Sequence, residues 1–107
     1  MTTTDAIPIR SVALSAAQAR CVRQLIDAVL PGARVAVFGS RATGRARPYS
    51  DLDLLVLEPP QLSGSQRADL RDAFEASDLP FKVDVVEASG LTGQMAQRVL
   101  DEAVSLP

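Results

Sequence analysis

The chain has 107 residues, a length that fits one domain, and 47% of these residues are apolar. Its formal net charge is −2 and its sequence pI is about 4.9. This balance disfavours long nucleic acid as a ligand, because such binding needs many basic groups to neutralise phosphates. The chain has no histidine and one cysteine, which excludes Ser-His-Asp triads, cysteine zinc sites and disulfides within one chain.

No stretch of the sequence predicts a membrane-spanning segment. The apolar runs at 35–38 and 54–57 are far shorter than the roughly 20 residues that a spanning helix needs. The first 20 residues carry Asp5, Arg10 and Arg20 and lack the apolar stretch of a secretory signal. We therefore expect a cytoplasmic protein with no membrane partner.

The N-terminal part of the chain predicts an arm followed by a helix. Residues 1–13 are rich in threonine and show no periodicity, so we expect an N-terminal arm there and a single domain over residues 14–107. Ser15 with Gln18 three residues later predicts a capping box. The apolar spacing that follows predicts an amphipathic helix, which Pro31-Gly32 should end.

The rest of the chain alternates between strand and helix patterns. Residues 34–38, 52–57 and 81–86 predict strands, and a short helical turn is expected after the first of them. Residues 65–77 have helical spacing. A last helix is predicted by one apolar stripe, made of Leu91, Met95, Val99, Leu100 and Ala103. This order predicts an α/β layer structure.

The segment from Gly39 to Leu54 carries the residues with chemical potential. Four arginines and no acid occur from Arg34 to Arg47, and two carboxylates then follow at Asp51 and Asp53. Basic groups near a turn suit phosphate oxygens, whereas clustered carboxylates suit a hard cation such as Mg²⁺. The segment therefore predicts a site for a metal-bound nucleotide.

Gly39 and Ser40 follow the first predicted strand, where a glycine lets the backbone turn sharply and approach a ligand. The Ser40 hydroxyl could then bind a phosphate. The alternative is that this pair only ends a strand and caps a helical turn.

Asp51 and Asp53 should point to the same face of a strand, with their Cα atoms roughly 6.6 Å apart. Asp84 lies among Val83, Val85 and Val86, where a carboxylate without a partner is costly. In a neighbouring strand it could join the first two, although turn chemistry, a solvated edge charge and an outward-facing edge strand remain open alternatives. Three carboxylates could hold two metal ions for transfer at a phosphate.

These motifs together resemble the nucleotidyltransferase superfamily that includes DNA polymerase β. The run Gly39-Ser40-Arg41-Ala42-Thr43-Gly44, the run Ser50-Asp51-Leu52-Asp53-Leu54 and the short chain resemble more closely the minimal nucleotidyltransferases of prokaryotes. Members of that group are commonly antitoxins paired with HEPN toxins. The resemblance implies a small mixed three-stranded sheet flanked by helices.

The resemblance also implies roles for individual residues. Gly39 and Ser40 would hold the triphosphate, and Arg41 would face phosphate unless it is an ordinary surface arginine. Asp51 and Asp53 would bind Mg²⁺, with two ions expected, and Asp84 would complete the metal site and help to activate the acceptor hydroxyl. For the antitoxin branch, the implied activity is transfer of AMP from ATP to a tyrosine of the cognate HEPN toxin.

Other functions remain open at this stage. The acceptor could be a small molecule, or the chain could neutralise a partner by docking alone. The short chain lacks the second domain that larger family members use to bind acceptors, so a protein partner is expected, and a homo-oligomer is possible. The partner surface is expected on the last helix, where Leu91, Met95 and Val99 could exceed what the core covers.

Overall fold

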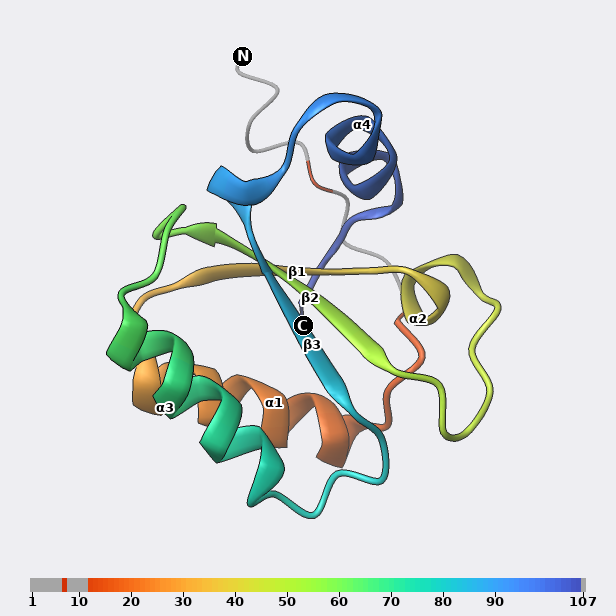
Figure 1. Ribbon diagram of the computed structural model, residues 1–107. Coiled ribbons are helices and arrows are strands. Elements are labelled where there is room, and N and C mark those ends of the chain that lie inside the picture. Colours follow the sequence, from red (N-terminus) through yellow and green to blue (C-terminus); the bar gives the residue numbers. More distant parts are fainter. Residues whose placement is uncertain (1–6, 8–11, 107) are drawn as a thin grey trace.

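The computed structural model describes residue 7 and residues 12–106 (Figure 1). Most of the expected N-terminal arm, like Pro107, lies outside the described residues, and the boundary after residue 13 stays a prediction. Within the described part of the chain, no helix is both long and apolar enough to cross a membrane.

Two long helices begin with the same capping arrangement. Helix α1 spans Ala16–Val29, and the predicted capping box is confirmed, because Ser15 Oγ accepts the Gln18 N–H at 3.0 Å and Gln18 Oε1 accepts the Ser15 N–H at 2.9 Å. Helix α3 spans Gly64–Glu75 and begins with an equivalent box made by Ser63 and Gln66. Both boxes satisfy backbone donors that a helix start leaves without partners.

The sheet is mixed and has four strands, so the expectation of three strands is wrong. The strands are β1 (Arg34–Phe38), β2 (Leu52–Glu58), β3 (Val83–Glu87) and β4 (Val104–Ser105), in the order β3-β2-β1-β4. Strand β1 is antiparallel to β2 and β4, whereas β2 and β3 are parallel. Strand β4 was not predicted, because two residues are too few to show strand alternation.

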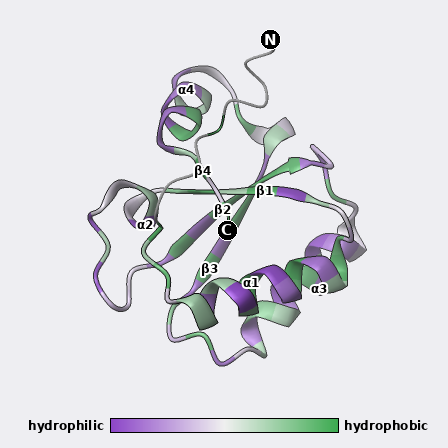
Figure 2. Cartoon of the chain, turned by 180° about the vertical axis from the view of Figure 1, so that it is seen from behind, coloured by the Kyte–Doolittle hydropathy of each residue, from purple (hydrophilic) through white to green (hydrophobic). Residues whose placement is uncertain are grey.

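Helices cover the two faces of the sheet unequally, as Figure 1 shows. Helices α1 and α3 lie on one face, α4 (Gly93–Glu102) lies on the other, and the single-turn α2 (Ser40–Thr43) lies at one end. Alternation along β1 divides the core, since Val35 and Val37 belong to the larger apolar cluster and Ala36 to the smaller one. Hydrophobic residues accordingly follow the strands and the inner sides of the helices (Figure 2).

The apolar stripe predicted for the last helix is only partly buried. Helix α4 begins after Leu91 and ends before Ala103, so the stripe extends beyond the helix at both ends. Val99, expected on a partner surface, is instead 1% exposed and packs against the sheet. Met95 and Leu100 are 50% and 49% exposed. The open apolar surface of α4 therefore differs in composition from the one expected.

Leu55→Ala should destabilise the fold much more than Leu100→Ala. Leu55 lies on β2 and is fully buried in the smaller core cluster, which also contains Val99 of α4. Removing such a side chain leaves a cavity that costs about 2–5 kcal/mol. Leu100 is half exposed, so its truncation should change the free energy of unfolding by only about 0.5 kcal/mol. Urea unfolding of both variants measures the difference. Equal losses in the free energy of unfolding would show that α4 does not bury the smaller core cluster.

Candidate active site

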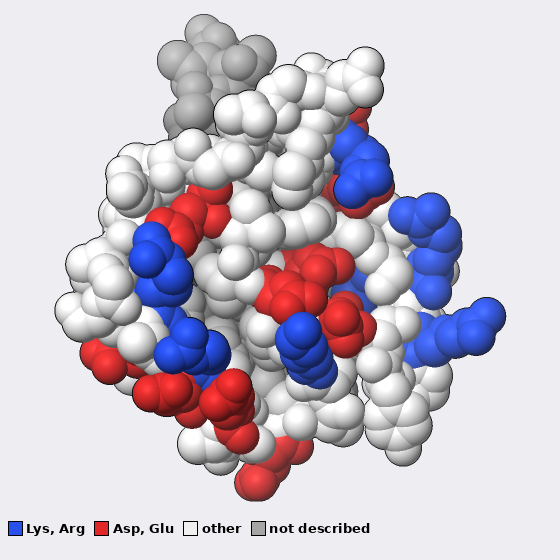
Figure 3. All heavy atoms as spheres, viewed as in Figure 1, with Lys and Arg blue, Asp and Glu red and all other residues white. Residues whose placement is uncertain are grey.

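The pairing of β2 with β3 brings two of the predicted carboxylates together. The strands are parallel, and Asp53 lies directly opposite Asp84 in their register. The neighbours Leu54 and Val85 contribute to the larger core cluster, so alternation turns both aspartates toward the face that carries α4. Asp51 is exposed and lies just before β2. Figure 3, which views the molecule from the side on which β3 lies in front, shows acidic side chains gathered near its middle.

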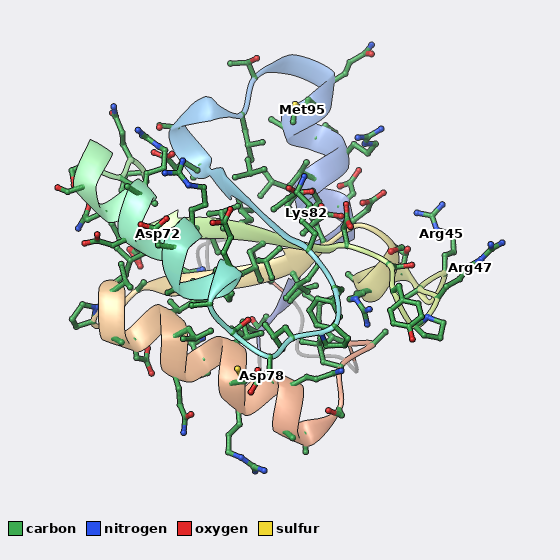
Figure 4. All side chains as sticks on the ribbon, turned by 60° about the horizontal axis from the view of Figure 1, so that its bottom comes forward. Arg45, Arg47, Asp72, Asp78, Lys82 and Met95 are labelled. Atoms are coloured by element: carbon green, nitrogen blue, oxygen red, sulfur yellow. The ribbon has the colours of Figure 1, made fainter. Side chains whose placement is uncertain are left out.

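Asp51, Asp53 and Asp84 form an acidic cluster, and their mutual repulsion is electrostatically unfavourable. Burial raises the pKa of Asp53, and the negative charges of Asp84, Asp51 and Glu102 raise it further. Lys82 lies beside the cluster, with its Nζ 3.4 Å from Asp84 Oδ1 (Figure 4). Because the Lys82 side chain is 72% exposed, this ion pair offsets only a small part of the repulsion.

Gly39 links β1 to α2 in a conformation that other residues rarely adopt. Its φ is +75° and its ψ is −154°, and a Cβ at this position would lie 2.3 Å from Asp53 Oδ2. Both the backbone angles and the close approach of the carboxylate therefore require glycine. Ser40 follows as the first residue of α2, so this contact fixes the predicted phosphate-binding pair next to Asp53.

Arg41 is not the ordinary surface arginine that was the alternative for it. Its side chain is buried, and the guanidinium donates hydrogen bonds to the backbone carbonyls of Ala13, Arg47, Pro48 and Ser50. The guanidinium also stacks over the Phe81 ring, 4.1 Å from its centroid. Burial lowers the pKa of Arg41, although an arginine remains charged at neutral pH.

This arrangement gives Arg41 a structural role in the loop that follows it. Three of its acceptors belong to residues 47–50, in the loop that leads from α2 to Asp51. Arg41 therefore holds in place the segment that delivers the first carboxylate. Arg45 and Arg47, on the same loop, extend outward at the edge of the molecule (Figure 4).

Glu102 is a site residue that the sequence reasoning did not find. It is the last residue of α4, and its Oε1 accepts the Gly39 N–H at 3.1 Å across 63 positions of sequence. Its other oxygen lies 3.9 Å from the Arg45 guanidinium. The only signal available was an acidic residue at the end of an amphipathic helix, which is not specific to any function.

The donor set suits a divalent cation, although the side chains are not yet gathered around one. Among the described residues, no three acidic or cysteine side chains already enclose a metal position. Carboxylate oxygens are the ligands that Mg²⁺ prefers, and the mutual repulsion at Asp53 is the kind of strain that a bound cation relieves. The chemistry of these residues therefore fits Mg²⁺.

A groove of about 400 Å³ lies between α3 and β3, on the side of the sheet that carries α1 and α3. Its wall includes Leu70, Phe74 and Phe81, and Asp84 and Lys82 also line it. Asp84 thus belongs both to the carboxylate cluster and to an open cavity. At Asp84 the groove reaches the edge strand β3.

Arg41→Lys should lower the free energy of unfolding by about 1–3 kcal/mol, because a lysine cannot reach four separate carbonyl groups and leaves some of them unsatisfied. Arg47→Lys, at an exposed position on the same loop, is the matched control and should have little effect. Urea unfolding measures both. An Arg41→Lys variant as stable as the control would contradict the role assigned to Arg41.

Asp53→Asn should raise the melting temperature at pH 7 in the absence of nucleotide and divalent ions. Because the pKa of Asp53 is raised on folding, the folded state holds the Asp53 proton more tightly than the unfolded state does. Ionisation therefore destabilises the fold as pH rises through the raised pKa, and the penalty persists above it.

The gain in melting temperature from Asp53→Asn should accordingly shrink as pH falls toward about 3.9, the pKa of an aspartate in the unfolded state. Asp78→Asn is the control, since Asp78 is exposed and lies away from the site (Figure 4). Thermal melts of the three proteins between acid and neutral pH make the comparison. A gain that is absent at pH 7, or equal at all pH values, would contradict the electrostatic account.

Comparison with known proteins places the chain in a family. A family model described as "Nucleotidyltransferase domain" matches residues 19–106. A Haemophilus influenzae protein named "Probable protein adenylyltransferase MntA" is 39% identical over 66 residues, and this match covers 62% of the present chain and 58% of the relative. The chain thus aligns with somewhat more than half of that relative's length.

Solved structures share the fold. A structure described as a minimal nucleotidyltransferase has 39% identity and a TM-score of 0.63, covering 82% of this chain and 88% of its own. A crystal structure of a toxin-antitoxin with AMP-PNP has 26% identity and a TM-score of 0.67, covering 83% and 72%. With most of its length matched by the family model, this chain belongs to the nucleotidyltransferase domain family.

Proposed function

We propose that the chain is a Mg²⁺-dependent nucleotidyltransferase that transfers AMP from ATP to a tyrosine of a cognate HEPN toxin, and that it thereby acts as an antitoxin in the cytoplasm. The observation that carries this proposal is the register of β2 and β3, which sets Asp53 opposite Asp84, next to the Gly39–Ser40 turn. Family membership supports the reaction class, and the named relative supports a protein as acceptor.

In this reaction, the oxygen of the acceptor tyrosine forms a bond to the α-phosphorus of ATP. The bond from that phosphorus to the bridging oxygen breaks, and pyrophosphate leaves. The tyrosine gives up one proton, for which the carboxylate of Asp84 is the acceptor. Asp84 is suited to this because its side chain is 42% exposed and can therefore meet a hydroxyl that another protein presents.

Asp51, Asp53 and Asp84 would hold Mg²⁺, which supplies charge stabilisation for the phosphates and the leaving oxygen when it is bound. The Ser40 hydroxyl, at the first position of α2, would donate to a phosphate oxygen. Gly39 leaves room for this approach, because it has no side chain between the turn and Asp53. These residues thus bind and orient the triphosphate.

A protein acceptor also agrees with two features of the surface. The groove beside Asp84 is open along the edge strand β3, so a segment of another protein has access to it. On the opposite side, Met95 and Leu100 leave apolar area of α4 exposed, and such area is common where a partner binds. A related toxin-antitoxin structure holds AMP-PNP, which supports ATP as the donor.

Incubation with α-labelled ATP, Mg²⁺ and a purified cognate HEPN toxin should label that toxin. Asp53→Asn should abolish the label and the increase in melting temperature that Mg²⁺ and ATP cause together, because it removes a carboxylate from the site. Asp78→Asn should retain both, and EDTA should remove both.

The acceptor residue is checked by replacing each tyrosine of the labelled protein with phenylalanine. Loss of label at one position would establish a tyrosine as the acceptor. Neutralisation of the toxin without any label would refute transfer and favour inhibition by docking alone. Label on a small molecule, with none on the protein, would instead identify a small-molecule acceptor.

A further inference from the structure

Glu102 joins α4 to the Gly39–Ser40 turn through its charged side chain. Its carboxylate accepts the Gly39 N–H at 3.1 Å, and its side chain is only 23% exposed. Gly39 is the residue at which β1 gives way to α2. The contact therefore ties the C-terminal end of one helix to the start of the proposed phosphate-binding turn.

The carboxylate of Glu102 lies near other negative charges. It is close enough to the acidic cluster to raise the pKa of Asp53. It also lies at the C-terminal end of α4, where the partial negative charge of the helix disfavours a carboxylate. Arg45, 3.9 Å away and with a 69% exposed side chain, offsets little of this cost. The hydrogen bond to Gly39 is thus the main contact that Glu102 gains.

Gly39 needs such an external contact because it has no side chain to restrict its backbone. Glycine has access to a wide range of φ and ψ angles, while the site requires one conformation, in which the Gly39 Cα lies against the Asp53 carboxylate. The Gly39 carbonyl is fixed by the N–H groups of Ala42 and Thr43. Glu102 fixes the other side of the residue, at its N–H.

We infer that Glu102 is a positioning residue of the nucleotide site, which holds the Gly39 peptide so that Ser40 faces the phosphates beside Asp53. This inference rests on the proposed function. It requires an acceptor oxygen at position 102 but not a negative charge there. Glutamine can supply that oxygen and alanine cannot, so the two substitutions separate the roles.

The test compares Glu102→Ala and Glu102→Gln in the full chain by calorimetry with Mg²⁺ and ATP. Glu102→Ala should weaken ATP binding by about tenfold, which corresponds to about 1.4 kcal/mol. Glu102→Gln should remain within about threefold of the wild type, since it keeps the acceptor. Asp101→Ala is the matched control, because Asp101 is exposed on α4 and pairs with Gln97, and it should bind ATP like the wild type.

Hydrogen exchange at the Gly39 amide, measured by NMR without nucleotide, provides a readout independent of binding. Protection should be lost in Glu102→Ala and kept in Glu102→Gln. Unchanged ATP binding by Glu102→Ala would overturn the inference. Tighter binding would also overturn it, because Glu102 would then compete with the nucleotide. Equal loss of binding in both variants would also overturn it, by assigning the effect to the charge.

Two further outcomes are decided by the same data. If Glu102→Ala does not fold, Glu102→Gln still decides, since loss of Gly39 protection in that folded variant would overturn the inference. If the wild type binds no ATP, the proposed function fails, and the positioning of Gly39 is judged by exchange alone. Protection of the Gly39 amide that is unaffected by Glu102→Ala would then overturn the positioning role of Glu102.

Discussion

The parallel, in-register pairing of β2 with β3 is the constraint on which the site depends. It places Asp53 opposite Asp84, and alternation along the strands sends both to the face that α4 covers only in part. The other face carries α1 and α3 and holds most of the buried side chains. The sheet can therefore keep unfavourable charges on one side because the larger core on the other side stabilises it.

Around this pair, backbone contacts hold the loops that bring the remaining groups. Arg41 binds the carbonyls of the segment before Asp51, and the missing side chain of Gly39 lets Asp53 approach the turn. Glu102 reaches the same turn from α4. Three elements distant in sequence thus meet at Gly39, where the chain has the least intrinsic conformational restriction.

Repulsion among the carboxylates of the site lowers the stability of the fold. Asp53 is partly buried near three other carboxylates, which raises its pKa, and Lys82 and Arg45 are too exposed to neutralise them effectively. Such strain is common where a protein binds a cation or a reacting group. The Asp84 side chain, 42% exposed, keeps the edge of this cluster accessible.

The sequence by itself determined the main helices, three strands and the residues of the acidic cluster, because capping boxes, strand alternation and the Gly-Ser and Asp-x-Asp runs are local patterns. It could not determine β4, whose two residues form a strand only because β1 offers an edge to pair with. Nor could it determine the environment of Arg41 or the contact between Glu102 and Gly39. Those depend on which segments pack together, so only the tertiary structure decided that Arg41 holds a loop and that the last helix reaches the site.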